Sequence, residues 1–187
     1  MNSWFEDNKK MWNERVPVHY SSDFYGMETF LAGRNSLTEI EQSELGQVNG
    51  KSILHLQCHF GQDSLSLARQ GARVTGVDFS TKAVEKARYL NDMLQLDARF
   101  ILSDVYQLPK HIDQKFDIVF TSFGVIGWLP DLKIWASVIK RFLKPEGVFY
   151  MAEFHPFLWL LDEKNNFSFR YPYFNKHVIT ELSEGTY

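Results

Sequence analysis

Acidic side chains stand directly after two short apolar runs in the middle of the chain. Asp78 closes the run 73–78, and Asp104 follows the run 98–102. Both runs have the composition of buried strands. In alternating α/β sheets, a carboxylate after the second strand accepts hydrogen bonds from ribose hydroxyls. We expect this role for Asp78, and we expect Asp104 and Val105 to contact an adenine-type base. The alternatives are a helix cap for Asp78 and a solvated loop position for Asp104.

A turn with one glycine follows the first apolar run, Ser52–Leu56. It reads Gln57-Cys58-His59-Phe60-Gly61 and leads into a predicted helix over 63–70. Gly61 permits tight backbone geometry where a ligand approaches, and the helix start offers free N–H groups. The same residues also fit an ordinary turn before a helix.

Ionisable and aromatic residues follow the last two predicted strands. The loop 121–128 after the strand 116–121 is apolar and aromatic, which fits either a ligand contact or a packed loop. Glu153 and His155 come at the end of the last predicted strand. Together with His19 they are the candidates for a general base, although a hydrogen-bonded structural role fits His155 as well.

Strands and helices alternate along the central part of the chain. Further helices are predicted over 80–90, capped by Ser80, and over 132–143, and the fifth strand is predicted over 148–153 after the turn Lys144-Pro145-Glu146-Gly147. This alternation predicts an α/β fold with a Rossmann-like, doubly wound, mostly parallel sheet. Ligands bind such sheets outside the carboxyl ends of the strands.

The two ends of the chain are rich in aromatic residues. We divide the chain into an N-terminal helical and aromatic segment (1–49), a core (50–153) and a C-terminal aromatic extension (154–187). Trp12, Tyr20 and Tyr25 are the candidate lid residues. A hydrophobic cap over the core, or a dimer face, explains the aromatic excess equally well. In the extension, residues 166–174 and 178–182 are predicted to be extended and to form a hairpin.

Composition excludes several classes of function. The net charge is −3 without any Lys/Arg stripe, so a nucleic-acid partner is not indicated. The single cysteine, Cys58, excludes an internal disulfide and a Cys-rich zinc site, and we expect no metal. No apolar run approaches the length of a membrane span, and the first residues lack the pattern of a signal peptide. We therefore expect a cytoplasmic protein without a membrane partner.

Three segments of the core resemble the class I S-adenosylmethionine (SAM)-dependent methyltransferases. They are Ala72–Ser80 with Ala83–Arg88, Phe116–Val119 and Leu143–Val148. The resemblance implies a seven-stranded sheet with an antiparallel last hairpin and with SAM across the carboxyl ends. It also implies that the cofactor is contacted by Gln57, Gly61, Asp78, Phe79, Asp104, Val105 and Thr121, and that the loop after the fourth strand faces its methionine half or the acceptor.

The chain departs from the usual pattern of that family in two places. The family's loop reads Asp/Glu-x-Gly-x-Gly-x-Gly, and the same positions here hold His55, Gln57, His59 and Gly61. The string His-Leu-Gln-Cys-His-Phe-Gly is similar to a subset of bacterial methyltransferase-like proteins. The chain also leaves only residues 154–187 for the helix and two strands that follow the fifth strand in the family. We expect those last strands to be missing, by truncation or with the sheet edge paired to a second copy.

Methyl transfer to a small organic acceptor is the function that these residues favour. A nicotinamide-dependent oxidoreductase would need a Gly-x-Gly-x-x-Gly turn, which residues 57–62 do not supply. A SAM- or nucleoside-binding module without catalysis, or a dimerising module, remains the alternative. Turnover of SAM to S-adenosylhomocysteine in the presence of acceptors distinguishes the two.

Overall fold

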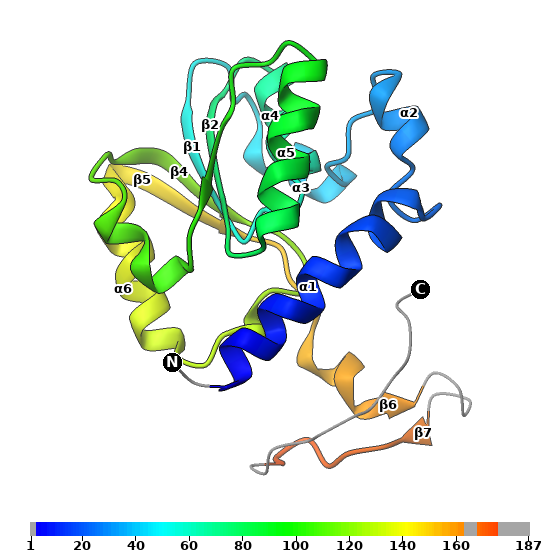
Figure 1. Cartoon of the computed structure of the whole chain (residues 1–187). Helices are drawn as coiled ribbons and strands as arrows, with labels where there is room; N and C mark the ends of the chain where they lie inside the picture. The colour runs from blue at the N-terminus through cyan, green and yellow to red at the C-terminus, as the bar shows by residue number, and fades with distance from the viewer. Residues whose placement is uncertain (1–2, 163–167, 176–187) are drawn as a thin grey trace.

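Five parallel strands form the central sheet in the computed structural model, which describes residues 3–162 and 168–175 (Figure 1). The strands are β1 Ser52–Leu56, β2 Arg73–Asp78, β3 Arg99–Leu102, β4 Phe116–Thr121 and β5 Leu143–Met151. Their order is β3-β2-β1-β4-β5, and each neighbouring pair is parallel. Every residue of the central strand β1 is buried, as expected for an apolar run covered on both faces. The predicted doubly wound α/β fold is confirmed.

Helices cover both faces of this sheet. The α-helices are α1 Ser3–Ser21, α2 Met27–Leu31, α3 Glu39–Leu45, α4 Gln62–Arg69, α5 Thr81–Met93 and α6 Leu132–Phe142. Short 3₁₀ helices are η1 Val105–Lys110, η2 Ile126–Trp128 and η3 Pro156–Leu160. Successive β1 side chains face opposite layers: Leu54 and Leu56 pack with Trp135 of α6, whereas Ile53 packs with Leu67 of α4. This alternation follows from the two-residue period of a strand.

The predicted turn before the fifth strand is a bulge within β5. Leu143 pairs with Phe116 and Val148 pairs with Ile118, so the intervening residues do not follow the regular register. Glu146 adopts a left-handed conformation there, with φ of 62°. The strand ends at Met151, two residues before the predicted end, although the Ala152 N–H still donates to the Thr121 carbonyl of β4 at 3.3 Å.

The C-terminal extension forms a small sheet of its own. β6 (Leu161–Asp162) pairs antiparallel with β7 (Ser168–Phe169). The described residues thus contain a five-stranded main sheet, whereas the resemblance implies seven strands. Of the piece predicted to be extended over 166–174, the described residues 168–174 form a strand only at β7. Residues 166 and 167, and the piece predicted over 178–182, lie outside the described residues.

The N-terminal segment 3–49 is helical wherever it is regular, as expected for the helical segment predicted over 1–49. Figure 1 shows α1 crossing beneath the sheet, with α5 next to it. The side-chain oxygen of Asn13 on α1 accepts hydrogen bonds from the Ser80 hydroxyl at 2.8 Å and from the Lys82 N–H at 3.0 Å. These contacts fix α1 to the start of α5, directly after the carboxyl end of β2.

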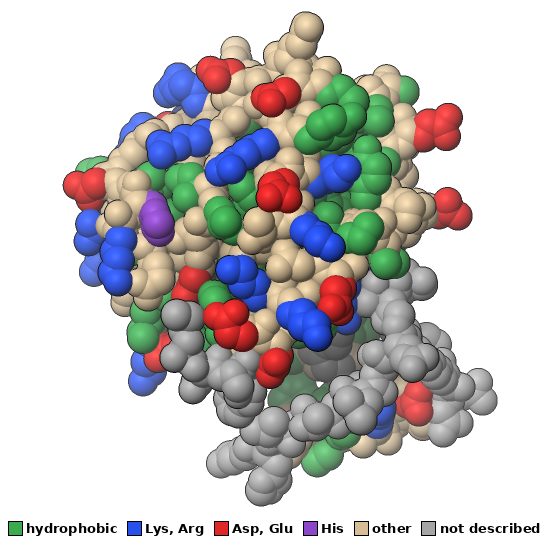
Figure 2. All heavy atoms as spheres, viewed as in Figure 1, with side chains coloured by type: hydrophobic (Ala, Val, Ile, Leu, Met, Phe, Trp, Pro, Cys, Tyr) green, Lys and Arg blue, Asp and Glu red, His purple; other side chains and the backbone are tan. Residues whose placement is uncertain are grey.

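One face of the molecule is mixed in charge. On the face shown in Figure 2, Lys and Arg side chains alternate with Asp and Glu and gather into no stripe of one sign. None of the helices in the described ranges has the length and apolar character that crossing a bilayer requires.

Candidate functional site

The turn after β1 takes left-handed backbone conformations at alternating positions. The φ angles are 51° at Gln57, 50° at His59 and 79° at Gly61. A Cβ atom on Gly61 would lie 2.6 Å from the ring of Phe100, so this position requires glycine. A left-handed conformation costs a residue with a side chain about 1–2 kcal/mol. The turn thus keeps the backbone path of a glycine-rich loop although two of its glycine positions carry side chains.

Asp78 joins this turn to the end of β2. Its carboxylate is buried and accepts hydrogen bonds from the N–H groups of His59 and Ser80, each at 2.8 Å. Burial raises the pKa of Asp78 to about 6, and the backbone N–H donors oppose this shift. The structure therefore brings the predicted turn and the predicted ribose-binding carboxylate into direct contact.

The side-chain amide of Gln57 is buried beside the turn. Neither its oxygen nor its nitrogen has a hydrogen-bond partner within the described part of the chain. A buried amide without a partner costs about 1–3 kcal/mol, and such groups commonly bind an ordered water or a ligand. This unpartnered amide and the Asp78 carboxylate are chemically suited to a cofactor that carries polar groups, as SAM does.

The remaining predicted cofactor residues differ in how accessible they are. Phe79 is half-buried, and its ring centroid lies 5.4 Å from that of Phe5 on α1. Asp104 is half-buried and caps η1 by accepting the Tyr106 N–H at 3.0 Å; burial raises its pKa. The side chain of Val105 packs in the core. Thr121 is fully buried, and its hydroxyl donates to the Leu56 carbonyl at 3.4 Å.

Two of the candidate bases hold backbone in place. The Glu153 carboxylate accepts the consecutive N–H groups of Gly124, Val125 and Ile126, which anchors the loop after β4. His155 is exposed, and its Nδ1 accepts the Phe157 N–H at 3.2 Å at the start of η3. Both side chains have structural partners in the described residues.

The third candidate base, His19, is buried against the turn. Its Nδ1 lies 3.0 Å from Nε2 of His59 and 3.3 Å from the hydroxyl of Tyr25. The ring of Trp12 packs at 5.5 Å from the rings of both His59 and Trp128. The side chain of His59 was missed by the sequence analysis, since a contact 40 residues apart leaves no local signal.

His55 occupies the position at which the family's loop carries an acid. The ring is buried, with Nδ1 2.8 Å from the Ser64 hydroxyl and Nε2 3.5 Å from the Ser122 hydroxyl. Burial lowers the pKa of His55 to about 3, so the ring is neutral near pH 7. A neutral hydrogen-bonding group therefore replaces a negative charge below the turn.

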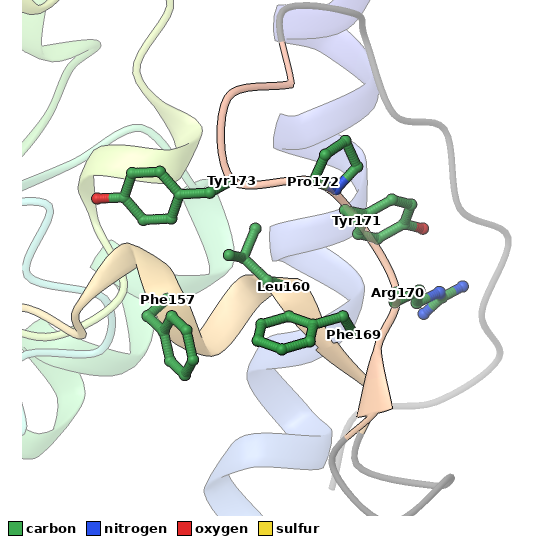
Figure 3. Close-up of a pocket in the computed structure, with 7 residues that line it drawn as sticks. All are labelled: Phe157, Leu160, Phe169, Arg170, Tyr171, Pro172 and Tyr173. Atoms are coloured by element: carbon green, nitrogen blue, oxygen red, sulfur yellow. The ribbon is translucent and has the colours of Figure 1, made fainter.

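An open hollow of about 600 Å³ lies in the C-terminal extension (Figure 3). Its walls are aromatic and apolar, with one arginine: Phe157, Leu160, Phe169, Arg170, Tyr171, Pro172 and Tyr173. None of the predicted cofactor residues or candidate bases lines this hollow. The predicted cofactor residues instead follow the carboxyl ends of β1, β2 and β3, or end β2 and β4.

Comparison with known proteins agrees with this geometry. Residues 53–147 match the family described as "Methyltransferase domain". The chain therefore belongs to this family of SAM-dependent methyltransferases. A methyltransferase of Synechocystis sp. is 28% identical over 153 residues, which cover 81% of this chain and 70% of the relative.

Two further relatives have named reactions. The ubiquinone biosynthesis O-methyltransferase of Pasteurella multocida is 31% identical over 125 residues, covering 62% of this chain and 51% of that protein. The 16S rRNA N2 G1207 methyltransferase of T. thermophilus, solved with AdoMet and guanosine, is 32% identical with a TM-score of 0.53, covering 60% of this chain and 32% of that one. The chain thus spans about half or less of these two proteins.

Proposed function

We propose that the chain binds SAM at the carboxyl ends of β1, β2 and β3 and transfers its methyl group to a small organic acceptor. One observation carries the cofactor assignment: the His59 N–H of the left-handed turn meets the buried Asp78 carboxylate at 2.8 Å. A turn with this backbone path beside a strand-end carboxylate is suited to a nucleoside.

The bound cofactor supplies a methyl group on a positively charged sulfur. Asp78 would hold the ribose hydroxyls, and Asp104, which follows the neighbouring strand, would contact the adenine. The Gln57 amide would satisfy a polar group of the ligand. The chain's contribution is then to position the acceptor and to exclude water, and a base is needed only if the acceptor must lose a proton.

The N-terminal helix supports a role as a lid. Trp12 of α1 packs on His59 of the turn and on Trp128 of the loop after β4, which joins three segments at the same sheet edge. Aromatic rings at this place can exclude water. The guanidinium of Arg15 lies 5.4 Å from the Trp12 ring and 5.8 Å from the Trp128 ring, so these two rings already carry a cation.

The packed rings of Trp12, His59 and Trp128 favour a small acceptor, and so does the mixed charge of the face shown in Figure 2. A nucleic-acid substrate would call for a basic face. The O-methyltransferase relative supports an acceptor hydroxyl, whereas the rRNA methyltransferase is the relative that argues for RNA. Assays of both acceptor classes with the same preparation decide between them.

Isothermal titration with SAM tests the cofactor assignment. We expect micromolar binding by the parent chain and a loss of at least about tenfold in Asp78→Ala, because the ribose hydroxyls lose their acceptor. Asp92→Ala, at an exposed position on α5, is the matched control and should bind as the parent does. Absence of SAM binding by the folded parent chain would refute the assignment.

The alternative of a SAM-binding module without catalysis has one observation in its favour. Glu153 and His155 are hydrogen-bonded to backbone, and His19 lies against His59, so each candidate base is already engaged. Formation of S-adenosylhomocysteine with a panel of phenols and amines would exclude that alternative. SAM binding without turnover across the panel would favour it.

A further inference from the structure

His59 combines a left-handed backbone with a side chain that is held from outside the turn. Its N–H donates to Asp78, so the φ of 50° at this residue is part of the candidate cofactor site. A residue other than glycine leaves this conformation readily unless its surroundings restrain it. Backbone hydrogen bonds from Cys58 N–H to the Val77 carbonyl and from Gly61 N–H to the Cys58 carbonyl hold the turn on either side of His59. Contacts of the His59 side chain add a second restraint at this residue.

Those contacts come from the N-terminal segment. The Nε2 atom of His59 lies 3.0 Å from Nδ1 of His19, and the ring lies against Trp12 at 5.5 Å and Tyr25 at 5.9 Å. His19 is itself stacked on Tyr25, with ring centroids 5.1 Å apart. The imidazole of His59 therefore contacts both α1 and the turn that follows α1.

At most one of the two imidazoles can be protonated if they share one hydrogen bond. Two nitrogens 3.0 Å apart need one donor and one acceptor, whereas two protonated rings would repel each other. Burial lowers the pKa of His19 to about 4 and that of His59 to about 3, with Arg15 lowering the first further. The hydrogen bond is therefore intact near neutral pH.

We propose that His19 is a positioning residue for the cofactor site: through its hydrogen bond to His59 it holds the turn in the left-handed conformation that presents the His59 N–H to Asp78. Packing of α1 over the strand ends and formation of the cofactor site then occur together. The proposal rests on the proposed function for its ligand, but its structural part concerns the free protein.

A pair of substitutions separates hydrogen bonding from packing. His19→Asn places an amide near the position of Nδ1 but loses the ring, whereas His19→Phe keeps an aromatic ring without the hydrogen bond. We expect His19→Asn to bind SAM within about threefold of the parent and His19→Phe to bind at least about tenfold more weakly. A residue that only fills space would give the reverse order.

Glycine at position 59 provides the rescue. Glycine adopts positive φ without a partner, so His59→Gly alone should bind SAM nearly as the parent does. The double variant His19→Phe/His59→Gly should bind like His59→Gly. Val18→Ala, at an exposed position on the same helix, is the control. A double variant as weak as His19→Phe would overturn the proposal.

Hydrogen exchange in the free protein keeps this test independent of SAM. The amides of residues 57–61 should exchange about tenfold faster in His19→Phe than in the parent and regain protection in the double variant. If the parent does not bind SAM, the proposed function fails. The hydrogen-exchange rates of residues 57–61 then decide alone whether His19 positions the turn. If His19→Phe does not fold, folding of the double variant supports the proposal, and failure of both contradicts it.

Discussion

At the scale of single residues, two glutamines share an unusual backbone conformation. Gln57 and Gln95 have φ of 51° and 53°, but Gln57 has a buried amide without a partner in the described residues, whereas Gln95 is exposed. The strain of the left-handed backbone is therefore common to both. Only Gln57 adds the cost of an unsatisfied polar group.

Replacing both glutamines by glycine measures that difference. We expect Gln57→Gly to raise the free energy of unfolding by about 1 kcal/mol more than Gln95→Gly does, because it removes the buried amide as well as the strain. Urea unfolding of the two variants and the parent is the measurement. Equal effects would mean that ordered water satisfies the Gln57 amide in the free protein.

The carboxyl group of Asp78 predicts a pH dependence of cofactor affinity. Its pKa is raised to about 6, so the group ionises as the pH rises through that value. Ribose hydroxyls donate to the ionised carboxylate, and SAM affinity should therefore increase from about pH 5 to about pH 7. Titrations in Asp78→Asn should lack this step; a parent-like step in the variant would assign it to another group.

At the scale of elements, Glu153 organises the loop that leads out of β4. Three consecutive N–H groups, from Gly124 to Ile126, point at one carboxylate that follows the end of β5. The loop carries Trp128, which contacts Trp12 of the N-terminal helix. One carboxylate thereby links the end of the sheet to the segment that covers the candidate site.

Neutralising this carboxylate should loosen the loop. Glutamine presents one oxygen and one NH₂ group where three N–H donors converge, so we expect Glu153→Gln to lower the free energy of unfolding by about 2 kcal/mol. Glu85→Gln, exposed on α5, is the matched control and should change it by less than about 0.5 kcal/mol. Similar values for both variants would show that the loop is held by its aromatic contacts.

At the scale of the whole molecule, local patterns predicted the sheet but not the contacts between distant segments. Apolar runs placed the strands to within one or two residues, apart from the bulge at Lys144–Gly147, whose composition is that of a turn. Asp78 and Gly61 were predicted as site residues because Asp78 ends the second strand and Gly61 closes the turn after the first strand. The structural use of Glu153 and the His19–His59 contact depend on packing across 27 to 40 residues, which no periodicity reports.

Buried histidines predict how the stability of the whole fold depends on pH. Burial lowers the pKa values of His55, His19 and His59 to about 3, 4 and 3, whereas the unfolded chain binds these protons near the ordinary histidine pKa of about 6.5. The unfolded state then holds more protons below about pH 6.5, so each histidine lowers the stability as the pH falls toward 4. The raised pKa of Asp78 acts in the opposite direction between 3.8 and about 6.

One variant isolates the contribution of the His55 proton to the pH dependence of stability. In His55→Asn the free energy of unfolding should depend on pH less steeply than in the parent, by about 1.4 kcal/mol per pH unit between about pH 4 and pH 6, because one proton no longer binds on unfolding. Urea unfolding across this range, with the exposed His111→Asn as the matched control, is the measurement. Parallel curves for the parent and His55→Asn would mean that the buried ring takes up its proton in the folded state.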